Sequence, residues 1–161
     1  MAVPKPGGPP KPYVSRVVKG DCLWDIGPDQ YAAAFAAMLK RDAYAHGDME
    51  SMMEAAEKRG GLAREYFEDR DYRAPLIYAP PAALDPPWLG ELKVRGRKGA
   101  WRLYFGEPVN RQGLVVPLDV GFKSDSDSRA TQTQQQHIER VMALLKSHFS
   151  ELGYTWRGFY D

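Results

Sequence analysis

The segment from residue 88 to residue 124 decides the fold of this chain. Its two halves read WLGELKVRGRKGAWRLYFGEP (88–108) and GLVVPLDVGFKS (113–124). Three runs rich in β-branched and aromatic residues are separated by glycine-containing turns at residues 96–99 and 107–113. Polar and apolar side chains alternate along each run, which is the period of a strand with one buried face. The segment therefore predicts three consecutive antiparallel strands.

Alternation assigns the side chains of these strands to two faces of a sheet. The predicted apolar face carries Leu92, Val94, Trp101, Leu103, Phe105, Leu114, Val116, Leu118, Val120 and Phe122. The opposite, solvent-exposed face carries Glu91, Lys93, Arg95, Arg102, Tyr104, Asp119 and Lys123. Pro117 interrupts the pattern because proline cannot donate to a β-ladder, so it indicates an edge strand or a β-bulge.

A long amphipathic helix follows the strands. Its apolar stripe consists of Ile138, Val141, Met142, Leu145, Phe149 and Leu152, which recur at helical spacing. Its polar side consists of Glu139, Arg140, Lys146 and Ser147. We expect this helix to begin near Gln134 and to pack its stripe on the apolar face of the sheet. The aromatic stretch GYTWRGFYD that follows is expected to pack against the core.

The region before the strands predicts a short strand and two helices. The strand is expected over residues 14–18, with a turn at residues 20–21. The side chains that then enter the core are Leu23, Trp24 and Ile26. Pro28 and Asp29 are typical of a helix start, and the inner face of that helix would hold Tyr31, Phe35, Met38 and Leu39. A second helix would follow a cap at Asp48 and face inward with Met49, Met52, Met53 and Ala56, ending at residues 60–61.

The octapeptide KGDCLWDI at residues 19–26 resembles the opening of a LysM repeat, a small module that binds peptidoglycan. Such a module needs two helices and a closing strand within about 45 residues, as the resemblance implies. Pro28 interrupts the expected first helix, and no closing strand is indicated before Gly61. The octapeptide therefore fits better as the entry to a different fold.

Composition limits the possible classes of function. The chain has 161 residues and a formal net charge of +1, so any attraction to nucleic acid must come from a local basic surface. Cys22 is the only cysteine, which excludes an internal disulfide and favours a reducing compartment. No apolar run approaches the roughly 20 residues that cross a bilayer. Residues 1–12 hold five prolines and two glycines, which predicts a flexible arm without the apolar core of a signal peptide.

The predicted order of strand, helix, helix, three antiparallel strands and helix resembles the RelE/HigB superfamily of type II toxins. These are small endoribonucleases of toxin–antitoxin modules that often cleave mRNA on the ribosome. The resemblance is carried by LGELKVRGRKGAWRLYFGEP, by GLVVPLDVGFKS and by the helix near Gln134. It implies one RelE-like α+β domain over residues 13–161, with the last helix packed on the sheet. It also implies a cytoplasmic location in a bacterial host, mRNA or the ribosome as target, a cognate antitoxin or other protein partner, and no membrane.

The resemblance also implies site residues for metal-free RNA cleavage. Such cleavage needs a base for the 2′-hydroxyl, cations for the developing phosphorane charge and an acid for the leaving 5′-oxygen. Arg102, which matches the family's strand arginine, would neutralise the scissile phosphate, and Lys123, after Gly-Phe, would do the same or donate a proton. Tyr104 would stack on a base or shuttle a proton. Apart from the resemblance, His137 at the start of the last helix would be either a general base or a capping or exposed residue. No metal and no cofactor are expected.

A local basic patch accompanies these residues. Lys93, Arg95, Arg97 and Lys98, together with Arg102, put five cations into ten residues, a pattern that favours contact with RNA phosphates. Solvated charges on an open sheet face would give the same alternation. The stretch SDSDSRATQTQQQ at 124–136 carries two aspartates that would repel phosphate. It would form either a solvated loop or a protein-binding surface.

Two other hypotheses stay open at this point. One is a non-catalytic relative of the same fold, encoded by a phage or its host, that binds a protein partner. The other is a structural component of a phage virion, for which the proline-rich arm and the LysM-like octapeptide are the supporting features.

Overall fold

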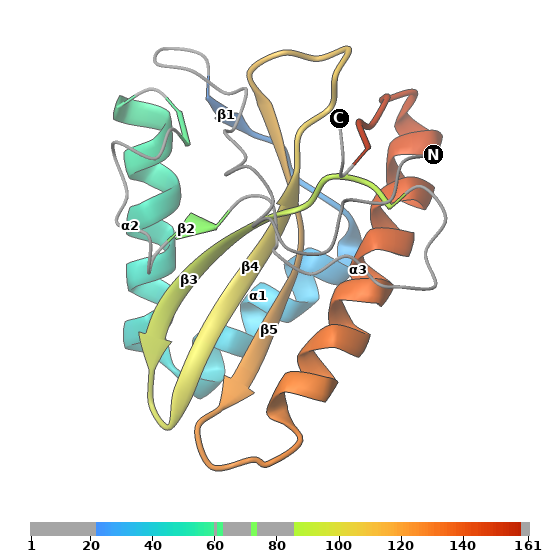
Figure 1. Ribbon diagram of the computed structural model, residues 1–161. Coiled ribbons are helices and arrows are strands. Elements are labelled where there is room, and N and C mark those ends of the chain that lie inside the picture. Colours follow the sequence, from blue (N-terminus) through green and yellow to red (C-terminus); the bar gives the residue numbers. More distant parts are fainter. Residues whose placement is uncertain (1–21, 60, 63–71, 74–85, 159–161) are drawn as a thin grey trace, which may run out of the picture.

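The computed structural model describes residues 22–59, 61–62, 72–73 and 86–158, and these residues form an α+β fold. The elements are β1 (Leu23–Trp24), α1 (Asp29–Arg41), α2 (Ala43–Arg59), β2 (Tyr72–Arg73), β3 (Gly90–Gly96), β4 (Gly99–Gly106), β5 (Leu114–Ser124) and α3 (Ala130–Leu152) (Figure 1). The arm predicted over residues 1–12, the strand over 14–18 and the turn at 20–21 lie outside the described residues. None of the described helices is both long and apolar enough to span a bilayer.

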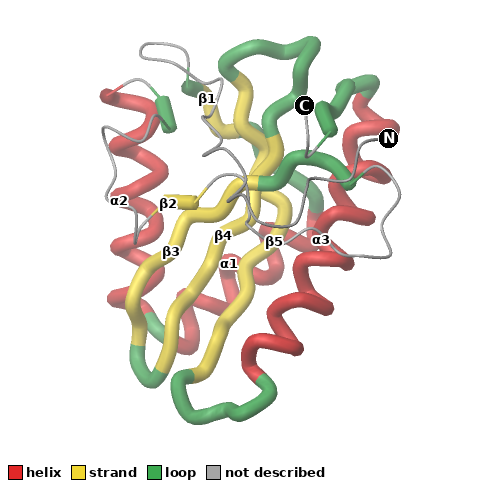
Figure 2. Tube along the Cα trace, in the orientation of Figure 1, coloured by secondary structure: helices red, strands yellow, loops and turns green. Residues whose placement is uncertain are grey.

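The described strands form one mixed sheet in the order β1-β5-β4-β3-β2 (Figure 2). β3, β4 and β5 are the three strands that the sequence predicts, and β4 pairs antiparallel with both β3 and β5. β1 pairs parallel with β5 at the edge, with Leu23 opposite Leu114. The prediction of three consecutive antiparallel strands is therefore confirmed.

Helices cover both faces of this sheet. α1 passes behind the sheet and α2 lies beside it, whereas α3 lies in front, along β5 (Figure 1). The residues of α3 pack with Tyr104, Val116 and Leu118, and those of α1 and α2 pack with Trp101 and Leu103 on the other side. The prediction that the last helix covers the face of Trp101 and Leu103 is therefore wrong. It covers the face that was predicted to be exposed.

A β-bulge in β5 explains this difference. Tyr104 lies opposite Asp119, but the next residue, Phe105, lies opposite Pro117, so Leu118 is an extra residue in the ladder. An extra residue reverses which face the side chains beyond it point to. Val120 consequently packs with α1 and α2, whereas Leu118 packs with α3. The bulge indicated by Pro117 is confirmed, and the single apolar face drawn through all of β5 is wrong.

The two helices before the sheet differ in detail from the prediction. α1 begins at Asp29 as expected and buries Tyr31 and Met38, but Leu39 is exposed. α2 begins at Ala43 and not after Asp48. Its earlier start has a physical cause, because the Asp42 carboxylate accepts a hydrogen bond from the backbone N–H of Ala45 at 3.1 Å and so caps the helix. The inward side of α2 is as predicted, with Met49 and Ala56 buried and Met52 and Met53 packed against them.

β1 contributes less to the core than the sequence suggests. The indole Nε1 of Trp24 donates to the Met53 carbonyl at 2.9 Å, so this side chain points toward α2. Leu23, its neighbour on a two-residue strand, points the other way and is 62% exposed. Ile26 lies in the connection to α1 and is 86% exposed. The prediction that Leu23 and Ile26 enter the core is wrong.

The last helix begins at Ala130, earlier than Gln134, so part of the polar stretch at 124–136 is helical. Ile138, Val141, Met142, Leu145 and Phe149 are buried as predicted, and Leu152 is exposed. After the helix, Tyr154 and Trp156 pack against its core, which confirms the expected packing of the aromatic stretch as far as residue 158. The helix start matters for the site, because it places His137 about two turns inside α3.

Candidate functional site

The four predicted catalytic residues line one pocket of about 190 Å³ between the sheet and α3. Arg102 and Tyr104 come from β4, Lys123 from β5 and His137 from α3. Arg102 lies opposite Gly121 in the β4–β5 ladder and Ala100 lies opposite Lys123, so Arg102 and Lys123 point to the same side of the sheet. His137 joins them only because α3 covers this side. The other lining residues are Gly121, Phe122, Thr133, Gln134 and Arg140.

His137 is held by a buried carboxylate. Its Nε2 lies 2.8 Å from Oδ2 of Asp119, which is 4% exposed. The same oxygen accepts a hydrogen bond from the Gln30 amide at 2.8 Å, and Oδ1 accepts one from the Val120 N–H at 2.8 Å. Burial raises the pKa of Asp119, but the hydrogen bonds from His137, Val120 and Gln30 outweigh burial and hold the pKa below its usual value. Asp119 is therefore ionised at neutral pH and orients the imidazole.

The other edge of the imidazole faces the floor of the pocket at Gly121. A Cβ atom at this position would lie 2.6 Å from Nδ1 and 2.7 Å from Cε1 of His137. The site therefore depends on glycine in the middle of β5, because any side chain here would displace the ring. In the neutral form of His137, a proton on Nε2 is favoured by Asp119, which leaves the lone pair on Nδ1.

Tyr104 forms the wall behind His137. Its side chain is 1% exposed, and its ring meets the imidazole edge-on with a centroid separation of 5.3 Å. This burial leaves no ring face for a nucleotide base to stack on. Burial and the nearby Glu91 carboxylate raise the pKa of the hydroxyl, so it stays protonated at neutral pH. Gln134 and Arg102 oppose this rise in the pKa but do not overcome it, so Tyr104 serves to position His137.

Arg102 forms a buried ion pair with Glu91. Nε of Arg102 lies 2.5 Å from Oε1 of Glu91, and the two side chains are 11% and 2% exposed. Alternation along β3 placed Glu91 on an open face, but the Glu91 side chain is buried. The Nη1 atom of Arg102 is also buried and has no hydrogen-bond acceptor in the part of the chain that the structure describes. The guanidinium is thus fixed on one side by Glu91 and lines the pocket on the other.

Three groups that bear on the chemistry of the pocket were not predicted as site residues. Gly121 and Arg140 line the pocket, and Asp119 binds His137 from outside the lining. Asp119 was assigned only to a sheet face, Arg140 was assigned to the polar side of the last helix, and Gly121 was not considered. Arg140 lies three residues after His137, and this helical spacing is the signal that would have placed both on one side of α3. With Arg102, Lys123 and Arg140 the pocket presents three cations beside a histidine, an arrangement suited to an anionic ligand such as a phosphodiester.

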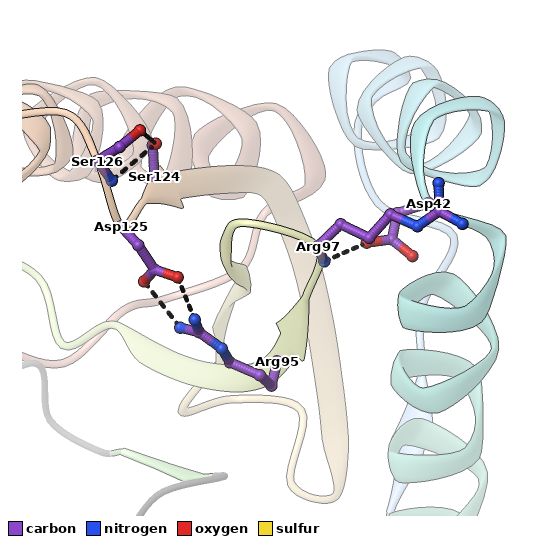
Figure 3. Close-up of polar contacts among 6 residues, drawn as sticks. All are labelled: Asp42, Arg95, Arg97, Ser124, Asp125 and Ser126. Carbon is purple, nitrogen blue, oxygen red and sulfur yellow. Dashed lines mark hydrogen bonds and ion pairs between the residues drawn. The ribbon is translucent and has the colours of Figure 1, made fainter.

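The predicted RNA-binding residues divide into two on strand β3, Lys93 and Arg95, and two in the turn after it, Arg97 and Lys98. Lys93 lies opposite Arg102 in the β3–β4 ladder, and Arg95 forms a two-pronged ion pair with Asp125, with Nη1 at 2.9 Å from Oδ1 (Figure 3). Arg97 and Lys98 form the turn between β3 and β4 and are exposed, outside the pocket. Asp125 therefore engages one of the predicted cations directly.

Within the described residues, no cluster of three or more His, Cys, Asp or Glu side chains is arranged to hold a metal ion. No protein-family model, curated protein or solved structure matches this chain.

Proposed function

We propose that this protein is a metal-independent endoribonuclease of the toxin type, which cleaves mRNA in the pocket between β4, β5 and α3. The observation that carries the proposal is the pairing of His137 with the buried Asp119 at the wall of a pocket that Arg102 also lines. A histidine oriented by a carboxylate is a common general base, and adjacent cations favour a pentavalent phosphorane.

The proposed reaction assigns one role to each group. Nδ1 of His137 accepts the proton of a ribose 2′-hydroxyl, and the 2′-oxygen attacks the adjacent phosphorus. The bond from phosphorus to the 5′-oxygen breaks, and the Lys123 ammonium donates a proton to that oxygen. Arg102 and Arg140 neutralise the non-bridging oxygens. The products are a 2′,3′-cyclic phosphate and a 5′-hydroxyl end, and solvent returns both residues to their starting protonation states.

The resemblance to the RelE/HigB superfamily supports the same proposal. The order α1, α2, β3, β4, β5 and α3, with the short β2 before β3, agrees with the order that the resemblance implies. The first strand that it implies, over residues 14–18, lies outside the described residues. We therefore propose a RelE-like arrangement for this domain, with the ribosome-bound message as its target and a cognate antitoxin as its protein partner. The cytoplasm of a bacterial host is the compartment that fits this role.

The decisive experiment compares wild-type protein with His137→Gln on end-labelled RNA, free and in translating ribosomes, in the presence of EDTA. General-base catalysis typically contributes 10²- to 10⁴-fold, so we expect a rate loss of about that size in His137→Gln with unchanged circular dichroism. Lys58→Ala removes an exposed lysine of α2 and should cleave like wild type. Intact RNA with folded wild-type protein, or equal cleavage by His137→Gln, would refute the proposal.

A second candidate is a non-catalytic member of the same fold that binds a host or phage protein. It is favoured by two ion pairs, Arg102 with Glu91 and Arg95 with Asp125, which neutralise two of the cations assigned to RNA. This candidate predicts that wild type and His137→Gln leave RNA equally intact in both assays. The two proposals therefore give opposite results in one experiment.

A further inference from the structure

The turn between β3 and β4 holds a lysine in a backbone conformation that lysine disfavours. Lys98 has φ of 58°, and it is the only residue other than glycine with positive φ among those the structure describes. At this position of a two-residue turn, glycine or asparagine is favoured because a Cβ atom is strained there. A strained residue of this kind persists only where its surroundings hold it, and such residues concentrate at functional sites.

Two other elements hold this turn by its backbone. The Asp42 carboxylate, between α1 and α2, accepts a hydrogen bond from the Arg97 N–H at 2.9 Å (Figure 3). On the other side, the N–H of Asp125, in the loop after β5, donates to the Lys98 carbonyl at 2.8 Å. The Asp125 carboxylate also binds Arg95 on β3, so one residue ties the loop to both the strand and the turn. The turn is thus fixed from two sides.

The side chains of the turn take no part in these ties. Arg97 and Lys98 are exposed, and neither forms an ion pair with another residue in the described ranges. Hydrogen bonds from the N–H groups of Arg97 and Ala45 lower the pKa of the Asp42 carboxyl group. The positive charge of the nearby Arg97 guanidinium lowers this pKa further. Lys98 is therefore the less compensated of the two cations.

The turn lies in line with the pocket. Lys98 lies in the turn just before β4, four residues ahead of Arg102, which at the usual strand rise places it about 13 Å away along the hairpin. Lys123, opposite Ala100, lies between them. A fixed cation at this distance from a scissile phosphate suits a contact with a neighbouring phosphate of an extended strand, because such contacts position a nucleic acid without reading its sequence.

We propose that the β3–β4 turn is a second contact for the substrate, at which Lys98 and Arg97 bind backbone phosphates of a single-stranded RNA that is engaged in the pocket. The inference rests on the proposed function for the nature of the ligand. It adds that the substrate is a strand long enough to reach both places, and that lysine occupies a position better suited to glycine because its charge is used.

Lys98→Gly separates this role from a structural one, because it relieves the backbone strain and removes the cation together. Binding is measured by fluorescence anisotropy with 2′-O-methyl RNA of 12 and of 3 nucleotides, which cannot be cleaved. We expect the slope of log K against log salt to fall by about 0.7 for the 12-mer, or about five-fold weaker binding at 0.1 M salt. Binding of the 3-mer should not change, and the thermal midpoint should rise.

Lys58→Ala is the control for net charge, since it removes an exposed lysine that pairs with Glu54 and lies about 24 Å along α2 from Asp42. Arg97→Ala keeps the N–H that Asp42 binds and should weaken the 12-mer in the same way as Lys98→Gly. The proposal would be overturned if Lys98→Gly bound the 12-mer as tightly as wild type, or lost no more affinity for it than Lys58→Ala does. A lower thermal midpoint in Lys98→Gly would also overturn it. Cleavage that persists beside such a result would leave the proposed function intact, and RNA binding at the turn without cleavage would refute the proposed function alone.

Discussion

Replacing Arg102 by methionine should strongly destabilise the fold, because it leaves the Glu91 carboxylate buried without its guanidinium. Glu91 is 2% exposed. At an effective dielectric constant near 20, two unit charges about 4 Å apart attract by about 4 kcal/mol. Removal of one partner from a buried pair costs about 3–5 kcal/mol, and the partial exposure of Arg102 favours the lower end of that range. A loss of about 3 kcal/mol is a large fraction of the 5–15 kcal/mol that stabilises a typical domain.

The double variant Glu91→Leu/Arg102→Met separates this stability effect from catalysis. Removal of both charges should restore most of the stability, since an apolar pair of similar volume is often neutral or better than a buried ion pair. Urea unfolding of the wild type, both single variants and the double variant gives the coupling free energy, which we expect to exceed about 2 kcal/mol. If Arg102 also binds phosphate, the double variant is stable but cleaves RNA poorly.

Arg140→Met is the matched control for this series. It removes an exposed cation from the same pocket without unpairing a carboxylate, so it should cost less than about 0.5 kcal/mol of stability while weakening cleavage. A loss below about 1 kcal/mol in Arg102→Met, or a double variant as unstable as the single ones, would refute the reasoning about the buried pair. A stable double variant with full activity would instead remove Arg102 from the proposed mechanism.

Four further predictions follow from the same region and from the core. Gly121→Ala places a methyl group 2.6 Å from Nδ1 of His137, so cleavage should fall by more than about ten-fold at a cost of about 1–3 kcal/mol in unfolding free energy; unchanged kinetics would contradict the packing. Asp119 has a pKa lowered in the fold, so it stabilises the protein above the unfolded value of about 4, and this contribution is lost as pH falls through the folded pKa. The pKa of Tyr104 is raised in the fold, so stability should fall above about pH 10, where this tyrosine ionises in the unfolded chain. The stability of Asp119→Asn and of Tyr104→Phe is measured against pH. A curve parallel to the wild-type curve would contradict the statement about the residue replaced. Burial, with Glu57 and Glu107 nearby, raises the pKa of the Cys22 thiol to about 12. Maleimide should therefore label Cys22 slowly in the native protein and quickly in urea. Fast labelling of the native protein would contradict this prediction.

The strands and the stripe of α3 were predictable because their signals are local. Alternation with a period of two fixes which neighbours share a face, and it correctly grouped Arg102, Tyr104 and Lys123 on one side of the sheet. The face that α3 covers was not predictable in this way. It depends on the extra residue at Leu118, which moves apolar side chains of β5 to the polar side, and the sequence signals this only through Pro117.

The candidate site shows the same division. Arg102, Tyr104, Lys123 and His137 were proposed from the resemblance and from residue type, but their common pocket exists only because α3 lies on the face opposite to the one expected. The environment of the charges was not predictable from spacing, since burial of Glu91 requires knowledge of the layer above it. The pairing of Asp119 with His137 joins residues 18 positions apart and likewise depends on tertiary packing.

The division of the pocket between two layers has a consequence for biosynthesis. Arg102 and Lys123 lie on strands that leave the ribosome before α3, which carries His137 and packs on Tyr104. A nascent chain that has completed β5 therefore contains Arg102 and Lys123 but not yet His137. Arg102, Lys123 and His137 therefore come together only after α3 has been synthesised and has packed on the sheet.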